Sequence, residues 1–535
     1  MSVPRDRRHF LKQAAALGLA RLGSRASAQM QGMAPMPSRQ AGPAPKPSNK
    51  PMLHALELTP FVDALPVPSA LLQAGPDTLR ITMREIHAKV HRDVPATRMW
   101  SYGPEALGPV IEAHKGVPGS IQWINHLPEE HFLPIDYSLH GCGHDMPDVR
   151  TCVHVHGARV RSKDDGHPED WFTPGSSRTA HYPFEQESAT LWYHDHAMGI
   201  NRLNHYAGLF GMLWLRDDLE RSLQLPTGSY EVPLMLYDRN FTSDGQLFYP
   251  TSGDPEHPWV PEFSGDAILI NGKIRPYFEV EPRLYRFRTV VAANSRFFSL
   301  SLSTGQPLIQ IGSDQGLLQA PVTMARLTLA PGERADFLID FTQLAGQQVR
   351  LRTGAEDILE FRVTAQLGAK FPAVIPATMR TIRRTPESDA IVTRTITLNE
   401  YQDGAQNSMM MLLNRKHWHE PVTERPRLGT TEIWEFVNQT EDTHPMHFHL
   451  VRFQILDRRT FDTFAFLMHK EMRYTAAAEL PPPNEVGWKD VVQCSAGAVT
   501  RVIVKFEGFV GDYLYHCHIL EHEANDMMRP FEVIA

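Results

Sequence analysis

The chain has little of several features that define other protein classes. Its 535 residues contain no apolar run of about 18 residues or more, which excludes a membrane-spanning helix. Lys and Arg, 53 in all, are outnumbered by 61 Asp and Glu, so the basic face that nucleic acid requires is missing. Few windows have a sustained helical period. With 35 Gly, 42 Pro and 42% apolar residues, the composition indicates a loop-rich globular protein.

Cysteine is scarce as well, with only four residues in the chain. Cys142 and Cys152 flank one short loop, and in an exported protein they could form a disulfide. We predict that Cys494 is a lone buried thiol. Cys517 stands between two histidines in "YHCHILEHEANDMM", which makes it a candidate metal ligand.

The first 28 residues have the pattern of an export signal. Arg7 and Arg8 lie in "DRRHFLK", a weakly apolar run "AAALGLA" follows, and "ASA" is a plausible cleavage site. We predict a twin-arginine signal over residues 1–28, hence a periplasmic or secreted protein; an unrelated basic N-terminus is the alternative. Removal of the signal changes the net charge from −8 to −13. Residues 29–51, rich in Pro and Met, are expected to form a flexible leader.

Short runs of Val, Ile, Thr and aromatic residues, separated by Gly and Pro turns, recur from residue 78 onward. Such runs, for example "GSIQWINHL" and "TRVIVKFEG", are typical of β-sandwiches. A repeat aligns "APGERADFLIDF" (330–341) with "SAGAVTRVIVKF" (495–506), so the middle third looks like a copy of the last third. We predict an all-β protein of three tandem sandwich domains, at 52–217, 228–370 and 390–535.

Ten of the 26 histidines fall into four clusters, "HVH", "HDH", "HPMHFH" and "HCHILEH". Alternate side chains of a strand share a face, so an H-x-H pair presents two imidazoles on one side, where they can bind a metal ion. A single pair could equally be two core histidines. Four clusters together make a metal site the better interpretation. In the repeat alignment the middle third has no such ligands, because His444, His447 and His449 fall opposite Arg296, Ser299 and Ser301.

The strand around Cys517 is predicted to serve two metal centres. His516 and His518 point to one face, whereas Cys517 points to the other. A thiolate, two imidazoles and a distant thioether favour a blue-copper site that cycles between Cu(I) and Cu(II). The candidate ligands of this site are His444, Cys517, His522 and Met527.

Eight imidazoles remain after that assignment, enough for three more copper ions with two or three ligands each. Such an all-nitrogen cluster can bind O2 and deliver several electrons to it. Zinc also binds Cys and His, but it seldom requires so many histidines with one cysteine and one methionine. The eight are His154, His156, His194, His196, His447, His449, His516 and His518.

The chain resembles the multicopper oxidases, the family of laccases, bilirubin oxidases and copper-efflux oxidases. The resemblance is carried by "CVHVHGARVRSKDDGHPEDWF", "WYHDHAMGINRLNHYAGLFG", "THPMHFHL" and "YHCHILEHEANDMMRPFEVI", and it covers residues 52–535. Bacterial spore-coat-type laccases are the nearest in appearance. The resemblance implies three cupredoxin-like Greek-key domains, with type 1 copper in the third and a trinuclear cluster between the first and third.

The same resemblance implies four copper ions and a role for each ligand. Type 1 copper would be bound by His444, Cys517, His522 and Met527, type 2 copper by His154 and His447, and the type 3 pair by His156, His194, His196, His449, His516 and His518. It also implies that Glu523 and Asp165 help to deliver the protons that O2 reduction consumes. The alternatives are that Glu523 only orients a ligand and that Asp165 is an ordinary turn residue.

We therefore expect an exported, monomeric, laccase-like enzyme that takes single electrons from phenolic, aromatic or bilirubin-like donors and reduces O2 to water. The alternative within the family is a Cu(I) or Mn(II) oxidase, to which the methionines of "SMMML" (408–412) could offer thioethers unless they pack in the core. A non-catalytic electron carrier and a two-domain nitrite reductase are disfavoured by the full set of histidines. The sequence leaves the roles of four other histidines open. His140 and His144 are either ligands of another metal ion or solvated loop residues, and His417 and His419 lie either at the rim of the type 1 site or in a strand.

Overall fold

The computed structural model describes residues 50–68, 71–365, 374–402 and 409–535. The predicted export signal and residues 29–49 of the predicted leader lie outside these ranges. Within them the chain is built mainly of β-strands, which confirms the predicted all-β class. No helix of the described part is long and apolar enough to cross a membrane.

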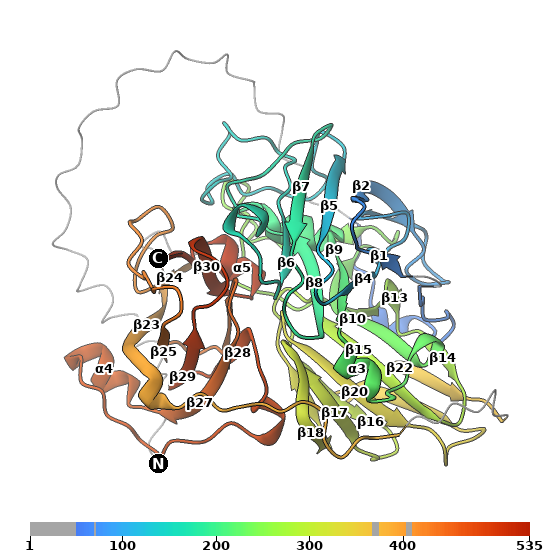
Figure 1. Ribbon diagram of the computed structural model, residues 1–535. Helices are drawn as coiled ribbons and strands as arrows, with labels where there is room; N and C mark the ends of the chain where they lie inside the picture. Colours follow the sequence, from blue (N-terminus) through green and yellow to red (C-terminus); the bar gives the residue numbers. More distant parts are fainter. Residues whose placement is uncertain (1–49, 69–70, 366–373, 403–408) are drawn as a thin grey trace, which may run out of the picture.

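Residues 52–217 contain two sheets (Figure 1). One has the strand order β1 (Leu72–Gln73), β4 (Ile111–His114), β9 (Phe210–Arg216), β8 (Ala189–Asp195) and β6 (Val153–His156). The other has the order β3 (Thr97–Ser101), β2 (Leu79–Ala88), β5 (Gly119–His126) and β7 (Ser177–Tyr182). All seven residues of β8 are buried, as expected of a strand covered on both faces.

Residues 228–370 also contain two sheets. The larger has the order β13 (Lys273–Ile274), β12 (Ala267–Ile270), β10 (Glu231–Phe241), β15 (Leu284–Val291), β20 (Arg334–Asp340), β17 (Leu308–Ser313) and β18 (Gly316–Met324), and β11 (Leu247–Phe248) pairs with β10. The smaller has the order β14 (Tyr277–Val280), β22 (Glu356–Val363), β21 (Gln348–Thr353), β16 (Phe298–Leu302) and β19 (Leu327–Leu329).

The last pair of sheets lies in residues 390–535. One sheet has the order β24 (Met409–Leu413), β23 (Ala390–Gln402), β25 (Thr431–Asn438), β29 (Ala498–Lys505) and β27 (Phe453–Thr460). The other has the order β28 (Val491–Cys494), β26 (His444–Phe448), β30 (Gly511–Cys517) and β31 (Met528–Val533). Each pair of sheets thus falls inside one of the three expected ranges, while the domain limits stay a prediction.

Helices of the described part are short. They are α2 (Asn201–Ala207), α3 (Asp218–Ser222), α4 (Thr463–His469) and α5 (Leu520–Ala524), with 3-10 turns η1 (Ala55–Glu57), η2 (Ser162–Asp164), η3 (Gly228–Tyr230), η4 (Glu387–Asp389) and η5 (Pro483–Glu485). Helices α2 and α5 contact each other although about 320 residues separate them in the chain. The contact brings the histidine-rich segments of the first and last ranges together.

One apolar core is shared by the first and last ranges. Trp123 and Tyr193 belong to the same buried cluster as Trp434, Phe448 and Phe531. This cluster is the largest in the described part of the chain, and burial of so much apolar surface is the main stabilising contribution to the arrangement. The two ranges therefore meet across a packed interface (Figure 1). The buried histidine groups combine residues of both ranges and so lie at this interface.

Candidate metal centres

Strand register brings the histidines of the two ranges into line. In the antiparallel pair β6–β8, His154 lies opposite His194. In the antiparallel pair β26–β30, His447 lies opposite His516, and Met446 lies opposite Cys517. Successive residues of a strand face opposite sides, so β30 presents imidazole to one side and sulfur to the other.

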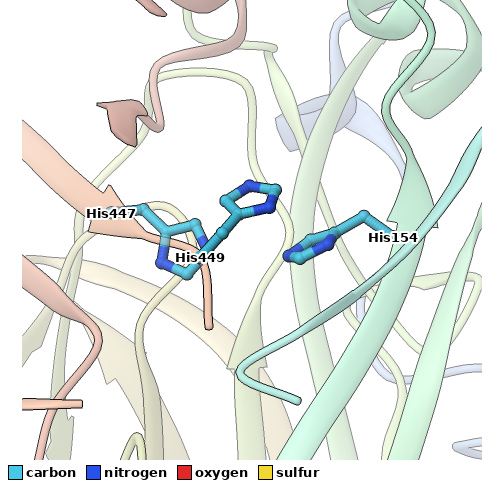
Figure 2. Close-up of side chains that lie close together, drawn as sticks. All are labelled: His154, His447 and His449. Atoms are coloured by element: carbon cyan, nitrogen blue, oxygen red, sulfur yellow. The ribbon is translucent and has the colours of Figure 1, made fainter. Parts of the chain in front are cut away.

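Three buried groups of imidazoles result, each with ligand nitrogens within 4.8 Å of one another. Figure 2 shows one of them, in which His447 and His449 face His154 from the opposite segment. The rings of His154 and His449 are stacked with centroids 3.8 Å apart. The groups are His154, His447 and His449; His156, His194 and His518; and His196, His449 and His516. All eight histidines predicted for the all-nitrogen cluster are therefore gathered in one place.

Hydrogen bonds fix one nitrogen of several rings and leave the other unpartnered. The Nδ1 atoms of His154 and His447 donate to the backbone carbonyls of Asp165 and Asp490, at 2.7 and 2.8 Å. The Nε2 atoms of both rings are buried without a partner, and so is Nε2 of His194. A buried ring nitrogen without a partner costs free energy unless a ligand binds it. In metal-binding histidines, one ring nitrogen usually donates to a carbonyl or carboxylate and the other binds the metal ion.

Burial also keeps these rings neutral. It lowers the pKa of His194 and of His196 to about 3. The pKa values of His154, His447 and His449 fall well below the ordinary value of 6.5 for the same reason, assisted by the neighbouring imidazoles. Because a metal ion binds neutral imidazole, the cluster needs no deprotonation before binding.

A second kind of centre lies on the other face of β30. The Sγ atom of Cys517 is 3.6 Å from Nδ1 of His444 and 3.7 Å from Nδ1 of His522, and those two nitrogens are 3.2 Å apart. All three side chains are buried, as is Met527. Burial raises the pKa of the Cys517 thiol well above 9.0, and a bound metal ion would deprotonate it. One sulfur with two imidazoles favours copper.

The two predicted carboxylates lie against these rings. Glu523 on α5 has Oε2 3.2 Å from Nδ1 of His516 and Oε1 3.5 Å from Nε2 of His196. Burial alone would raise its pKa, but the two imidazoles outweigh that effect and the pKa is lowered. Asp165 accepts a hydrogen bond from Nδ1 of His449 at 2.7 Å, and burial raises its pKa well above 3.8.

Asp490 is a buried residue of the centre that we did not single out from the sequence. Its Oδ1 lies 3.1 Å from Nε2 of His156, whose Nδ1 is left unpartnered. Arg334 donates to both of its oxygens at 2.5 Å, and Gln315 donates to Oδ2 at 2.5 Å. Because these donors occupy the carboxylate, Asp490 is suited to orienting His156. The only sequence signal was its place in "NEVGWKDVV", between two of the histidine clusters.

We expect the Asp490→Asn variant to lose about 3–5 kcal/mol of unfolding free energy, because the fully buried Arg334 loses its nearest anionic partner and keeps only the more distant Asp314, at 4.0 Å. Copper content should fall as well, since His156 loses its orienting group. Denaturant unfolding and metal analysis measure the two effects. Asp357→Asn is the control: Asp357 pairs with Arg350 near the surface, so its loss should cost less than about 1 kcal/mol. Equal effects of the two changes would contradict this role of Asp490.

Cys142 and Cys152 do not form the disulfide that their spacing suggested. Both are free and buried, as are Cys494 and Cys517. The Sγ atom of Cys142 lies 3.7 Å from Nη2 of Arg150, whereas Sγ of Cys152 donates to the carbonyl of His167 at 3.1 Å. Each thiol thus has its own polar contact, and nearness in sequence did not give the geometry that a disulfide requires.

Comparison with known proteins gives consistent results. Two multicopper oxidase family models match residues 144–220 and 391–535, ranges that together contain all four histidine clusters. The laccase of Bacillus subtilis (strain 168) is 43% identical in an alignment 511 positions long, which covers 89% of this chain and 99% of the relative. The laccase of Haloferax volcanii is 35% identical in an alignment 574 positions long, gaps included, which covers 99% of this chain and 91% of the relative. The crystal structure of the McoA multicopper oxidase from Aquifex aeolicus is 27% identical, with a TM-score of 0.74, over 88% of this chain and 99% of that one.

Proposed function

The chain belongs to the multicopper oxidases and is a laccase-like oxidase that uses O2, and from this premise we propose that it is exported and oxidises phenolic, aromatic or bilirubin-like donors. Four one-electron oxidations of donor would be coupled to the reduction of one O2, with four protons, to two waters. The observation that carries the proposal is the pair of buried ligand sets on the two faces of β30, one with sulfur and one of imidazole alone.

The residues fit copper, which the family requires. The fit rests on the buried ring nitrogens without a protein partner and on the sulfur-and-imidazole set at Cys517. Copper bound there would supply one-electron oxidation of the donor and reduction of O2. We assign type 1 copper to His444, Cys517, His522 and Met527, type 2 copper to His154 and His447, and the type 3 pair to His156, His194, His196, His449, His516 and His518.

We assign proton delivery to Glu523 and Asp165. Glu523 accepts a hydrogen bond from Asn201 at 2.5 Å and lies against two imidazoles, a position from which its carboxylate can take up a proton and pass it to the cluster. Asp165 supports a second path, because its carboxylate contacts His449 and its carbonyl contacts His154. The proposed export by the twin-arginine route to the periplasm or beyond, and a monomeric state, rest on the sequence alone.

Oxygen consumption by the copper-loaded enzyme tests the choice of donor. We expect faster turnover with phenols and bilirubin than with Cu(I) or Mn(II), and one O2 consumed for every four electrons taken up. Saturation kinetics with each donor under the same conditions provide the measurement. Preference for a metal ion over every organic donor would overturn the proposed substrate class.

A metal-ion oxidase is the second candidate, and a group of carboxylates favours it. Oε1 of Glu400 lies 3.3 Å from Nε2 of His444, at the edge of the proposed type 1 site. Burial raises the pKa of Glu262, and the charges of Asp442 and Glu400 raise it further, so these acids lie near one another. Met411, one of the methionines considered from the sequence, is buried in the apolar core instead. Under this alternative, Glu400→Gln would abolish metal oxidation and spare phenol oxidation.

A further inference from the structure

Two loops that are far apart in the chain bring the imidazoles of His140 and His417 to one carboxylate at the protein surface, with the ring of His419 beside both. Asp526 has Oδ1 3.1 Å from Nδ1 of His140 and Oδ2 2.8 Å from Nδ1 of His417. The ring of His419 has its centroid 5.8 Å from that of His140 and 5.7 Å from that of His417. Solvent reaches the group, since the side chains of His140 and His417 are 30% and 41% exposed. Only the fold brings these residues together, because residues 140 and 417 belong to different ranges of the chain.

We propose that His140, His417, His419 and Asp526 bind one divalent transition-metal ion, in addition to the four copper ions of the oxidase. Three imidazoles and one carboxylate form a ligand set suited to zinc or copper(II), whereas calcium and magnesium prefer oxygen alone. For comparison, the imidazoles of His444 and His522 have centroids 5.1 Å apart in the proposed type 1 site. The ring of His419 is less than 1 Å further than this from the ring of His140 and from that of His417, a gap that side-chain rotations can close.

The loop that carries His417 and His419 is held in place by a buried arginine. Nη1 of Arg529 donates to the backbone carbonyls of His417, of Trp418 at 2.9 Å and of Glu420 at 3.1 Å. Between the two histidines, the Trp418 side chain is buried and packs against Met198, Leu514 and Met528. Three carbonyls on one guanidinium fix the backbone, so the imidazoles are presented from a rigid base.

The loop that carries His140 is held in the same way. Arg150, only 1% exposed, donates to the carbonyl of Gly141, to that of Pro147 at 2.7 Å and to that of Met198 at 2.8 Å. Gly141 has a φ of 74°, and a Cβ there would meet Met198 at 2.5 Å. A rigid loop loses little conformational entropy when a metal binds, which favours binding.

The charge at the site favours a cation. Asp526 brings a carboxylate whose two oxygens face the imidazoles of His140 and His417. Glu169 adds a second negative charge next to the loop, where it accepts a hydrogen bond from Trp418 Nε1 at 2.9 Å.

Zinc titration of the fully copper-loaded enzyme tests the site, with calorimetry for the affinity and metal analysis for the content. We expect one additional Zn²⁺ per chain with unchanged copper content and unchanged blue absorbance. His419→Ala should weaken zinc binding roughly 10- to 100-fold, as for other losses around a metal site. The matched control is His144→Ala, because the His144 ring lies on the same loop as His140 but stacks on Tyr137 with centroids 4.1 Å apart. The affinity of the His144→Ala variant for zinc should equal that of the wild type.

A melting experiment adds a readout that is independent of the heat of binding. The ion would join the loops of two ranges, so zinc should raise the melting temperature of the wild type and of His144→Ala, but not of His140→Ala/His417→Ala/His419→Ala. The proposal is overturned if no saturable zinc binding occurs, or if the triple variant binds zinc as tightly as the wild type. If the triple variant folds poorly, His419→Ala alone still tests the proposal, because His419 is exposed. An affinity for zinc equal to that of the wild type would overturn the proposed site.

Discussion

The Cys517→Ser variant is expected to lose the blue absorbance and its oxygen uptake with every organic donor, the latter on the order of 10³-fold or more. A serine hydroxyl is harder than a thiolate and stays protonated, so it cannot replace the sulfur that faces His444 and His522 at 3.6 and 3.7 Å. The backbone of the same residue joins His516 to His518, which belong to the imidazole groups. Loss of the sulfur would therefore cut the shortest covalent connection between the two kinds of centre.

Cys142→Ser is the matched control for this change. Cys142 is also a buried thiol, but its nearest polar contact is Arg150 and it lies outside the four histidine clusters. We expect this variant to keep the blue colour, the copper content and the oxygen uptake of the wild type. Visible absorbance and oxygen-electrode measurements on metal-analysed protein provide the comparison. Retention of both colour and turnover by fully metallated Cys517→Ser would contradict the assignment of Cys517.

The alternation of side chains along a strand made the two faces of β30 predictable. The rule needs only local geometry: His516 and Cys517 must point to opposite sides wherever the strand lies. The all-β class followed for a similar reason, since strands and turns have short-range signals. The separation of sulfur from imidazole could thus be predicted from the sequence before any contact between distant segments was known.

The contacts of Asp490 could not be predicted in this way. Its role depends on β28 lying beside β26 and on Arg334 reaching it from the second range, a separation of 156 residues in the chain. The role of Asp490 depends on its burial, because a carboxylate paired with arginine in the interior matters far more for stability than the same residue in a solvated loop. The sequence contains no local signal of that burial.

The loop histidines show the same limit. Nothing in the sequence relates His140 to His417, and Asp526, next to Met527, was not predicted to be a ligand. Only the docking of two arginine-held loops brings them together. The disulfide that the sequence left open is absent for the complementary reason: Cys142 and Cys152 are close in sequence, but their side chains face different contacts, so proximity along the chain was a poor guide to geometry.

The Glu523→Gln variant is expected to slow the reaction with O2 by roughly 10²- to 10³-fold, the range typical of a lost proton donor. Glutamine keeps the size of the side chain and can remain near Asn201 and His516, but its amide cannot take up a proton and pass it on. Oxidation of the donor does not need that proton. Anaerobic bleaching of the blue colour by a phenol should therefore proceed at the wild-type rate, whereas return of the colour on mixing with O2 should be slow.

Glu521→Gln separates this effect from a general disturbance of α5. Glu521 is a fully buried carboxylate on the same helix, but it contacts Tyr249 and Asn294 rather than an imidazole. We expect it to lower stability and to leave the ratio of the bleaching rate to the colour-return rate unchanged. Stopped-flow measurement of both rates in each variant gives this ratio. If Glu523→Gln slowed both rates equally, or if Glu521→Gln slowed the O2 step alone, Glu523 would be a structural residue of the helix and the proton would reach the cluster by another path.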